Sequence, residues 1–242
     1  MDKVTQFSNR LSETGLNIGA GNLAYYLSWL FRNVDIQGST VLDVGSGSGL
    51  FSYFAAWMGA AAVVSLEPEA AGSTSNVIRD YPRVISSLGL NNIELLAIPI
   101  QEYDPHGDQF DIVLLHDSIN HLEESACIQL RRSRGARIKY ERIFDRLQVM
   151  TRSGGTLIIV DCSPYNLFSS VRLKNPFSPT IEWHKHQPPG VWVKMLRSHG
   201  FIRPSVHWIG FGRLGRIGEV FMDNPVMAFL TTSRFRLEMK RA

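Results

Sequence analysis

Short apolar runs alternate along the chain with stretches in which apolar residues recur every three or four positions. Five of these runs predict buried strands, at residues 40–44, 62–66, 93–97, 110–115 and 155–160. The stretches between them have helical spacing. One places its apolar residues at i, i+3, i+4 and i+7, namely Tyr140, Ile143, Phe144 and Leu147. Strands that alternate with helices predict a doubly wound α/β fold, with a mostly parallel sheet covered on both faces.

The same pattern marks two regions outside the alternating units. Residues 1–38 contain the apolar stretch LAYYLSWLF and predict helices. Residues 164–189 are rich in proline but carry large apolar residues such as Trp183, so they predict an ordered loop rather than a linker. At the end of this loop, Pro188 and Pro189 predict the start of a helix, because proline suits the first helical turn.

A glycine-rich turn follows the first predicted strand. The stretch 41–50 reads VLDVGSGSGL and joins this strand to a helix. Its glycines, Gly45, Gly47 and Gly49, lack the Cβ atoms that would keep a ligand's polar groups from backbone N–H donors. Dinucleotide-binding proteins use the spacing GxGxxG, but here the third glycine comes one position early and Leu50 takes its place. The spacing therefore argues against a dinucleotide.

Two acids accompany the glycines. Asp43 stands two residues before the first glycine, and Glu67 ends the next predicted strand. With these residues the chain resembles the class I S-adenosylmethionine-dependent methyltransferases, whose first motif reads roughly hhDhGxGxG and whose second strand ends in an acid. FDIVLLHDSINHL, at 110–122, resembles the family's fourth strand and the turn after it, and RSGGTLIIVD, at 152–161, resembles the fifth. The resemblance covers about residues 40–162.

The resemblance implies a fold and a cofactor. The fold is a mostly parallel seven-stranded sheet with helices on both faces, finished by an antiparallel C-terminal hairpin from strands near 204–210 and 226–232. The cofactor is S-adenosylmethionine, with S-adenosylhomocysteine as the product. Glu67 would hold the ribose hydroxyls, and His116 would line the methionine end. The residues implied to bind the cofactor are Asp43, Gly45, Ser46, Gly47, Gly49, Glu67, Pro68, Ile100, Gln101 and His116.

One position departs from the family pattern. Members often carry an aspartate after the third strand, where it binds the adenine amino group, whereas this chain has Pro99 there. We therefore expect the backbone around Ile100 and Gln101 to read the adenine, together with the Gln101 amide.

Length and composition are consistent with one domain and some additions. A chain of 242 residues that is 44% hydrophobic can bury a full core. We predict that residues 39–242 form the cofactor-binding domain. Residues 1–38 would form a helical cap over the cofactor cleft, as such extensions do in similar enzymes, and residues 164–189 would form an active-site loop.

The charge of the chain indicates no nucleic-acid partner by itself. The formal net charge is only +3. Positive charge is concentrated in one segment, at Arg131, Arg132, Arg134, Arg137 and Lys139. We interpret this segment as a solvated helix face, with an anion-binding patch as the alternative.

The cysteines and the apolar runs indicate where in the cell the protein would be found. Cys127 and Cys162 are too few for a disulfide framework and lack metal-binding spacing. The polar start of the chain does not read as a signal peptide, and no run approaches the ~20 apolar residues of a membrane span. We expect a cytoplasmic protein with no membrane span. The oligomeric state is open, and a homodimer is one possibility.

Histidines are the candidates for catalysis. Methyl transfer to a hydroxyl needs a group that removes the proton, and a histidine suits this near neutral pH. His121 follows the fourth strand, and His184 and His186 lie in the loop expected over the carboxyl ends of the strands. If the loop were extended, both loop histidines would face one side, with Trp183 on the other. We predict Trp183 and Asp117 as substrate contacts.

Two other chemistries fit the residues less well. A metal site could be imagined from His184, His186, Asp161 and Asp117, but no Asp-Asn pair follows the fifth strand, where metal-dependent catechol methyltransferases keep one. Methylation of bases or of protein glutamine usually goes with an Asn/Asp-Pro-Pro-aromatic tetrad after the fourth strand. The stretch 116–119 reads HDSI instead. We therefore predict no metal, and we disfavour DNA, rRNA and protein-glutamine substrates.

These observations lead to one functional hypothesis and two alternatives. The hypothesis is methyl transfer from S-adenosylmethionine to a small-molecule acceptor, at a hydroxyl or carboxyl oxygen and without a metal. One alternative is an RNA methyltransferase that uses the arginine segment. The other is an inactive, cofactor-binding regulatory subunit, because intact glycines and Glu67 argue only for binding.

Overall fold

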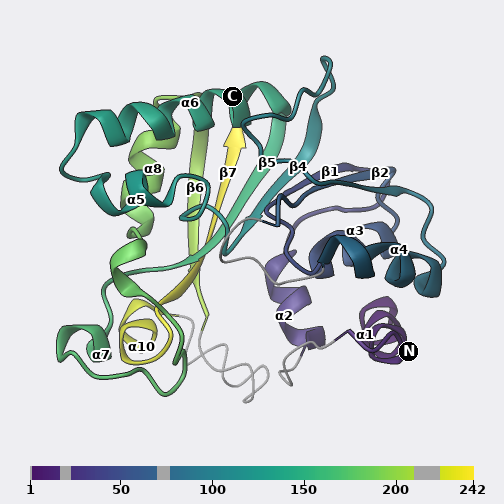
Figure 1. Cartoon of the computed structure of the whole chain (residues 1–242), viewed down its shortest axis with the longest axis horizontal. Helices are drawn as coiled ribbons and strands as arrows, with labels where there is room; N and C mark the ends of the chain where they lie inside the picture. Colours follow the sequence, from purple (N-terminus) through teal and green to yellow (C-terminus); the bar gives the residue numbers. More distant parts are fainter. Residues whose placement is uncertain (1, 17–22, 70–76, 210–223) are drawn as a thin grey trace.

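The computed structural model describes residues 2–16, 23–69, 77–209 and 224–242, and its centre is one seven-stranded sheet (Figure 1). The strands are β1 (Thr40–Val44), β2 (Ala62–Leu66), β3 (Ile93–Leu96), β4 (Phe110–His116), β5 (Thr151–Cys162), β6 (Phe201–Trp208) and β7 (Arg234–Arg241). Their order is β3-β2-β1-β4-β5-β7-β6. Neighbours from β3 to β5 are parallel, and β7 is antiparallel to both β5 and β6. The predicted fold class is confirmed, including the antiparallel C-terminal pair.

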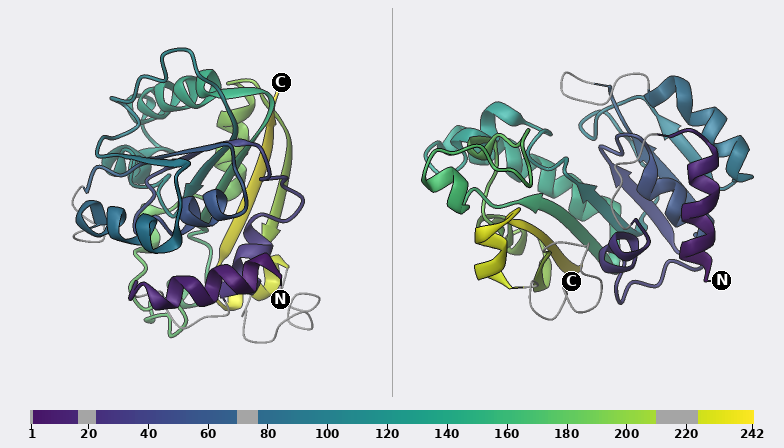
Figure 2. Two further views of the ribbon diagram at one scale, coloured as in Figure 1. Left: turned by 90° about the vertical axis from the view of Figure 1, so that its right-hand side faces the viewer. Right: turned by 90° about the horizontal axis from the view of Figure 1, so that it is seen from below.

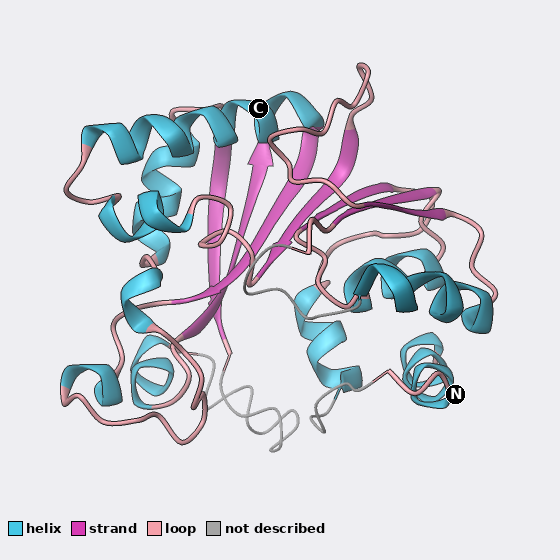
Figure 3. Ribbon diagram, viewed as in Figure 1, coloured by secondary structure: helices cyan, strands magenta, loops and turns pink. Residues whose placement is uncertain are grey.

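Helices cover both faces of the sheet (Figures 2 and 3). Those described are α1 (Lys3–Glu13), α2 (Leu23–Leu30), α3 (Leu50–Trp57), α4 (Val77–Leu88), α5 (Glu124–Gln129), α6 (Arg134–Met150), α7 (Leu167–Ser170), the 3-10 helix η1 (Trp183–Lys185), α8 (Pro189–Arg197) and α10 (Pro225–Leu230). Helices α1 to α4 supply one hydrophobic core, and α5, α6 and α8 supply the other.

The central strands contribute to both cores at once. In β4, Val113 and Leu115 belong to the core of α5, α6 and α8, while Ile112 and Leu114 belong to the opposite core. This alternation follows from the pleat of a strand, in which successive side chains point to opposite faces. It explains why these strands are nearly continuous apolar runs in the sequence.

The helices predicted from periodicity form as expected. In α6, the residues at i, i+3, i+4 and i+7 are all buried, and one of them, Tyr140, packs against Trp192 of α8 with ring centroids 5.3 Å apart. Helix α8 begins at Pro189. The basic residues predicted for a solvated face, from Arg131 to Lys139, are exposed.

The prediction for the C-terminal tail was partly wrong. A strand was expected near 226–232, but this segment is helix α10, and the strand comes later, at β7. The side chain of Asn224 accepts hydrogen bonds from the N–H groups of Val226 and Met227, and Pro225 occupies the first helical position. An asparagine cap followed by proline starts a helix strongly enough to override a short apolar run.

Residues 1–38 form two helices in their described parts. Phe7 of α1 meets Phe54 of α3 with ring centroids 5.2 Å apart, so α1 packs on the helix that follows the glycine turn. The role of this region as a cap over the cofactor stays a prediction. Within the described ranges, no helix is long and apolar enough to cross a membrane.

The carboxyl ends of the parallel strands share one edge of the sheet. β1 ends at Val44, β4 at His116 and β5 at Cys162, and the antiparallel β7 begins at this edge with Arg234. Open α/β sheets bind their ligands at this edge. The polar residues predicted for the site therefore come together although they are far apart in the sequence.

Candidate active site

The glycine turn is packed on one side and open on the other. The N–H groups of Gly45 and Ser46 both donate to the carbonyl oxygen of Leu66, which ties the turn to the end of β2. Gly45 has φ +70°, and a Cβ added there would lie 2.6 Å from the Cβ of Ser118. A Cβ added to Gly47, with φ +52°, would meet none of the described residues within 4 Å. The backbone at Gly47 thus faces open space that a ligand can fill.

Glu67 directs its carboxylate at this turn. Its Oε2 accepts from the Gly47 N–H at 2.7 Å, and its Oε1 accepts from the Glu69 N–H at 2.9 Å, while only 3% of the residue is exposed. The buried hydroxyl oxygen of Ser46 finds no partner among the described residues. The turn thus offers a cofactor rich in polar groups three features: the open backbone of Gly47, the fixed carboxylate of Glu67 and the hydroxyl of Ser46. Neighbouring Pro68 is exposed. The individual contacts of these residues to the cofactor stay predictions.

Asp43 lies beneath the glycine turn in a buried polar chain. Its Oδ2 accepts from the Ser52 hydroxyl at 2.6 Å, the Ser65 hydroxyl donates to Ser52 at 2.7 Å, and Ser65 contacts the Tyr81 hydroxyl at 2.5 Å. Its Oδ1 has no partner within the described ranges. Burial raises the pKa of Asp43 to about 7. Its predicted cofactor contact remains untested, and its observed contacts hold β1 to α3.

We expect Asp43→Asn to stabilise the cofactor-free protein by an amount that grows between about pH 4 and pH 7. The unfolded carboxyl ionises near pH 4, and the folded one near pH 7. The folded state therefore binds more protons in this window, and the wild type loses stability as the pH rises. Above this window the difference in unfolding free energy between Asp43→Asn and the wild type should stay constant. It should amount to a few kcal/mol, at roughly 1.4 kcal/mol per pKa unit.

Urea unfolding of wild type and Asp43→Asn at pH 5 and pH 8 measures this difference. His116, whose pKa burial lowers to about 4, adds the opposite slope, but it does so equally in both proteins. A stability difference of the same size at both pH values would contradict the expectation.

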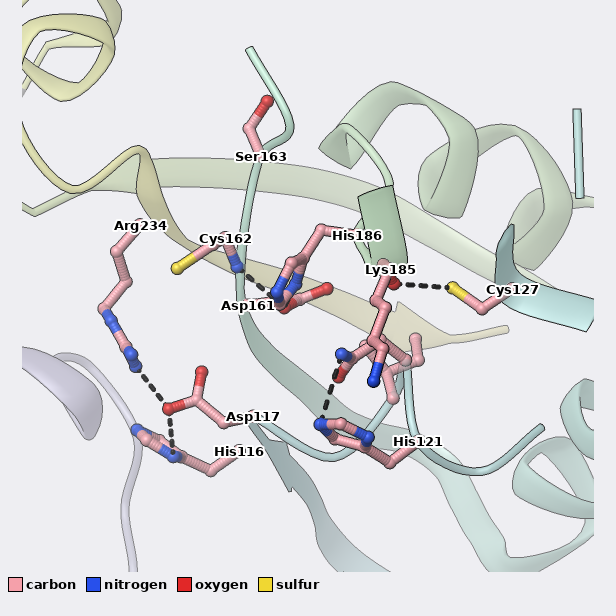
Figure 4. A network of polar contacts seen from close by, with 12 residues as sticks. His116, Asp117, His121, Cys127, Asp161, Cys162, Ser163, Lys185, His186 and Arg234 are labelled. Carbon is pink, nitrogen blue, oxygen red and sulfur yellow. Dashed lines mark hydrogen bonds and ion pairs between the residues drawn. The ribbon is translucent and has the colours of Figure 1, made fainter. Parts of the chain in front are cut away.

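The end of β4 carries a tightly packed polar group (Figure 4). The His116 Nε2 lies 2.5 Å from the Tyr26 hydroxyl of α2, and the His116 ring packs on Phe51 with centroids 4.1 Å apart. Burial lowers the pKa of His116 to about 4, so the imidazole is neutral at pH 7. His116 thus joins α2 and α3 at the edge where we predict the methionine end of the cofactor.

Asp117 follows His116 and binds the first residue of β7. Its backbone has φ +52°, and its Oδ2 accepts from Arg234 Nη1 at 2.7 Å. Burial alone would raise the pKa of Asp117, but the Arg234 guanidinium, together with His116 and His186, holds the pKa below its usual value. Arg234 Nη1 also lies 3.4 Å from the Tyr26 hydroxyl. The predicted substrate contact of Asp117 is untested, although the residue lies at the correct edge.

Fully buried Asp161 pairs with partly buried His186 beside this group (Figure 4). The His186 Nδ1 lies 2.7 Å from the Asp161 Oδ1, which also accepts from the Cys162 N–H. Asp161 is fully buried, and burial raises the pKa of its carboxyl although His186 acts to lower it. The other oxygen, Oδ2, has no partner in the described parts of the chain. A carboxylate that holds Nδ1 leaves the Nε2 end of the ring for a reacting group.

The two loop histidines do not share one side, so that expectation was wrong. Trp183 to Lys185 form η1, in which the Lys185 N–H donates to the Glu182 carbonyl, and this tight turn replaces the alternation of an extended strand. His186 follows the turn and points inward to Asp161, whereas His184 is exposed and Trp183 is partly exposed.

His121 lies in a more exposed position. Its side chain is 49% exposed, with Nδ1 at 3.1 Å from Glu124 Oε2 and Nε2 at 3.3 Å from Asn120. Glu124 also binds Lys185 at 3.0 Å. His121 therefore belongs to a surface cluster of charges, while His186 is the histidine held by a buried acid.

The segment expected to read adenine follows β3. The Ile100 carbonyl accepts from Arg146 Nε at 3.0 Å, and the Gln101 amide nitrogen donates to the Leu122 carbonyl at 2.8 Å. These bonds fix the turn against α6 and against the segment after β4. The adenine contacts of Ile100 and Gln101 stay predictions.

Sequence reasoning missed Tyr26 and Arg234 and gave Asp161 only a minor place as a metal ligand. Tyr26 stood within an apolar stretch, and Arg234 lay beyond the strand predicted for the tail, so neither carried a local signal. Asp161 ends an apolar strand in the way that Asp43 precedes the glycine turn, and this was a usable signal.

Comparisons with known proteins agree with this geometry. Residues 36–198 match the methyltransferase domain family. Ribosomal protein L11 methyltransferase from Methylococcus capsulatus is 36% identical over 107 residues, and the chain matches only 36% of that protein's length. A methyltransferase from Aquifex aeolicus shares the fold over 100% of both chains, with 13% identity and a TM-score of 0.59.

Magnesium protoporphyrin IX methyltransferase from Synechocystis, solved with S-adenosylhomocysteine, shares the fold over 100% of both chains, with 16% identity and a TM-score of 0.55. These structural likenesses concern the fold, and the family match spans more than half of the chain. The chain therefore belongs to the methyltransferase domain family, the S-adenosylmethionine-dependent methyltransferases of class I.

Proposed function

We propose that the protein transfers a methyl group from S-adenosylmethionine to the hydroxyl oxygen of a small-molecule acceptor, without a metal. The observation that carries this proposal is the 2.7 Å contact between His186 and the fully buried Asp161. A hydroxyl acceptor requires a base, whereas an ionised carboxyl acceptor does not. The oriented histidine thus supports the hydroxyl over the carboxyl.

In this reaction His186 would act as the base and Asp161 would orient it. His186 takes the proton of the acceptor hydroxyl on Nε2 as the acceptor oxygen bonds to the methyl carbon. Asp161 holds Nδ1, which sets the ring's orientation and stabilises the positive charge that the ring gains. When bound, S-adenosylmethionine supplies a methyl group on a positively charged sulfur, which keeps the electron pair of the broken bond.

Other residues would bind the cofactor. The Gly47 backbone, the Ser46 hydroxyl and Glu67 would hold its ribose and neighbouring polar groups. Tyr26, His116 and Phe51 would line its methionine end. These roles rest on the open side of the glycine turn and on the packing at the end of β4.

The test is methyl transfer from labelled S-adenosylmethionine to a panel of alcohols, phenols and carboxylic acids, with and without EDTA. We expect an O-methylated product from a hydroxyl compound and the same rate after chelation. A rate that is lost with EDTA and restored by Mg²⁺ would contradict the metal-free part. Cofactor binding with no turnover on the panel would favour the inactive regulatory subunit.

A protein acceptor is the second candidate. It is favoured by the 36% identity to a ribosomal protein L11 methyltransferase, although the match covers a minor part of that enzyme. Adding purified L11 as one arm of the panel tests it. Label in the protein rather than in a small molecule would replace the first proposal with this one.

A further inference from the structure

The structure has an apolar cavity of about 400 Å³. None of the residues assigned above to catalysis or to cofactor binding lines it. Its walls include Ser163, Tyr165, Pro188, Pro189, Trp208 and Phe229. The volume lies within the range of pockets that bind small molecules. Among the described residues, those that line it carry no charge.

The register of the sheet relates the cavity to the pair. Asp161 of β5 and Trp208 of β6 are both paired with Phe235 of β7, which lies between them. Paired residues on neighbouring strands point to the same face, so the three side chains form one row across the sheet. Two strand spacings separate its ends by about 10 Å. The cavity wall at Trp208 thus lies on the same face as Asp161, a short distance along the row.

The sequence also connects the cavity with the Asp161–His186 pair. Ser163 stands two residues after Asp161, and Pro188 stands two residues after His186. Both segments that supply the pair therefore continue directly into the cavity wall. The cavity wall and the pair are thus built by the same two segments of the chain.

The walls are held in position by the fold. The Trp208 ring packs edge-on against Phe235 with centroids 5.9 Å apart. The Tyr165 hydroxyl accepts from Arg131 Nη1 at 3.3 Å, and the Ser163 N–H donates to the Ser233 carbonyl at 2.8 Å. Proline and aromatic walls of this kind offer flat apolar surfaces and few polar groups, which suits a planar ring and not a charged molecule.

We propose that this cavity binds the ring system of an uncharged aromatic acceptor, whose hydroxyl points along the row to His186. The proposal rests on the proposed function for the chemistry, but the ring site is a binding property of its own. A one-ring or two-ring compound would pack on Trp208 and Phe229, and a carboxylate on the ring would lose its hydration against these apolar walls.

The experiment measures binding of 2-naphthol by titration calorimetry in the presence of S-adenosylhomocysteine. Phe229→Ala removes one wall and should weaken binding about tenfold, since a lost aromatic contact costs roughly that factor. Leu230→Ala is the matched control on the same helix, because Leu230 is 38% exposed and does not line the cavity. Its affinity should equal that of the wild type. 2-Naphthoate, the charged counterpart, should bind at least tenfold more weakly than 2-naphthol.

Absence of 2-naphthol binding to the wild type, equal affinity in Phe229→Ala, or equal affinity for 2-naphthoate would each overturn the proposal. Phe229→Leu keeps an apolar wall and should retain most of the affinity, which separates loss of the wall from loss of folding. Because the experiment measures the affinity for 2-naphthol, its result does not depend on whether the protein catalyses methyl transfer. If 2-naphthol binds as expected while no hydroxyl compound is methylated, the ring site holds and the proposed function fails.

Discussion

Replacement of His186 by alanine is expected to lower turnover about 10²- to 10⁴-fold while leaving S-adenosylhomocysteine affinity unchanged. This range is the usual contribution of a positioned base. The fall in rate at low pH, where a histidine base is protonated, should disappear in the variant. The measurements are kcat against pH with a hydroxyl acceptor, and calorimetric titration of S-adenosylhomocysteine.

Two other histidines provide matched controls. His184→Ala changes an exposed neighbour in the same loop and should turn over normally, and His121→Ala should lose little because His121 belongs to the surface cluster with Glu124. Asp161→Asn should lower kcat, as His186→Ala does. It should also alter the dependence of kcat on pH, which would not change if Asp161 had only a structural role. If His186→Ala turned over normally while His121→Ala failed, the base would lie after β4 and the loop would only cover the site.

Replacement of Glu67 by alanine is expected to weaken S-adenosylmethionine binding by ~1.5 to 3 kcal/mol, through the loss of hydrogen bonds from the ribose hydroxyls to a charged acceptor. This corresponds to about a tenfold to 150-fold increase in Kd. Titration calorimetry with S-adenosylmethionine and S-adenosylhomocysteine measures it, and NAD should not bind to the wild type.

The control for charge is Glu69→Gln, which removes one negative charge close to the turn but keeps an acceptor where Glu69 caps the N–H of Ile78. It should bind the cofactor nearly as well as the wild type. Unchanged affinity in Glu67→Ala would remove Glu67 from the cofactor site and leave its bond to the Gly47 N–H as a structural tie.

The central strands could be predicted because each is a buried apolar run beside a turn signal. The carboxyl-edge residues after β1, β2 and β4 could be predicted for the same reason, since a polar residue directly after such a run is conspicuous. Glu67 is the best example, because it ends VVSL and then bonds to the glycine turn.

The rest depended on contacts between segments far apart in the sequence. Nothing near His186 in the sequence indicates that Asp161 will bind it, because the partner stands 25 residues earlier. The short turn of η1 overrode the extended spacing assumed for the loop. Tail strand β7 was misplaced because the Asn224 cap turned the preceding apolar run into α10.

The place of β7 in the sheet has a consequence for the order in which the protein can form. β7 is the last strand in the sequence, yet it lies between β5 and β6, and its first residue binds Asp117 across 117 positions. Until β7 has been synthesised, β5 and β6 each present an unpaired inner edge, and the row from Asp161 to Trp208 lacks its middle member. A nascent chain at this stage exposes strand edges that favour aggregation. The site can therefore form only after β7 is available to pair with both β5 and β6.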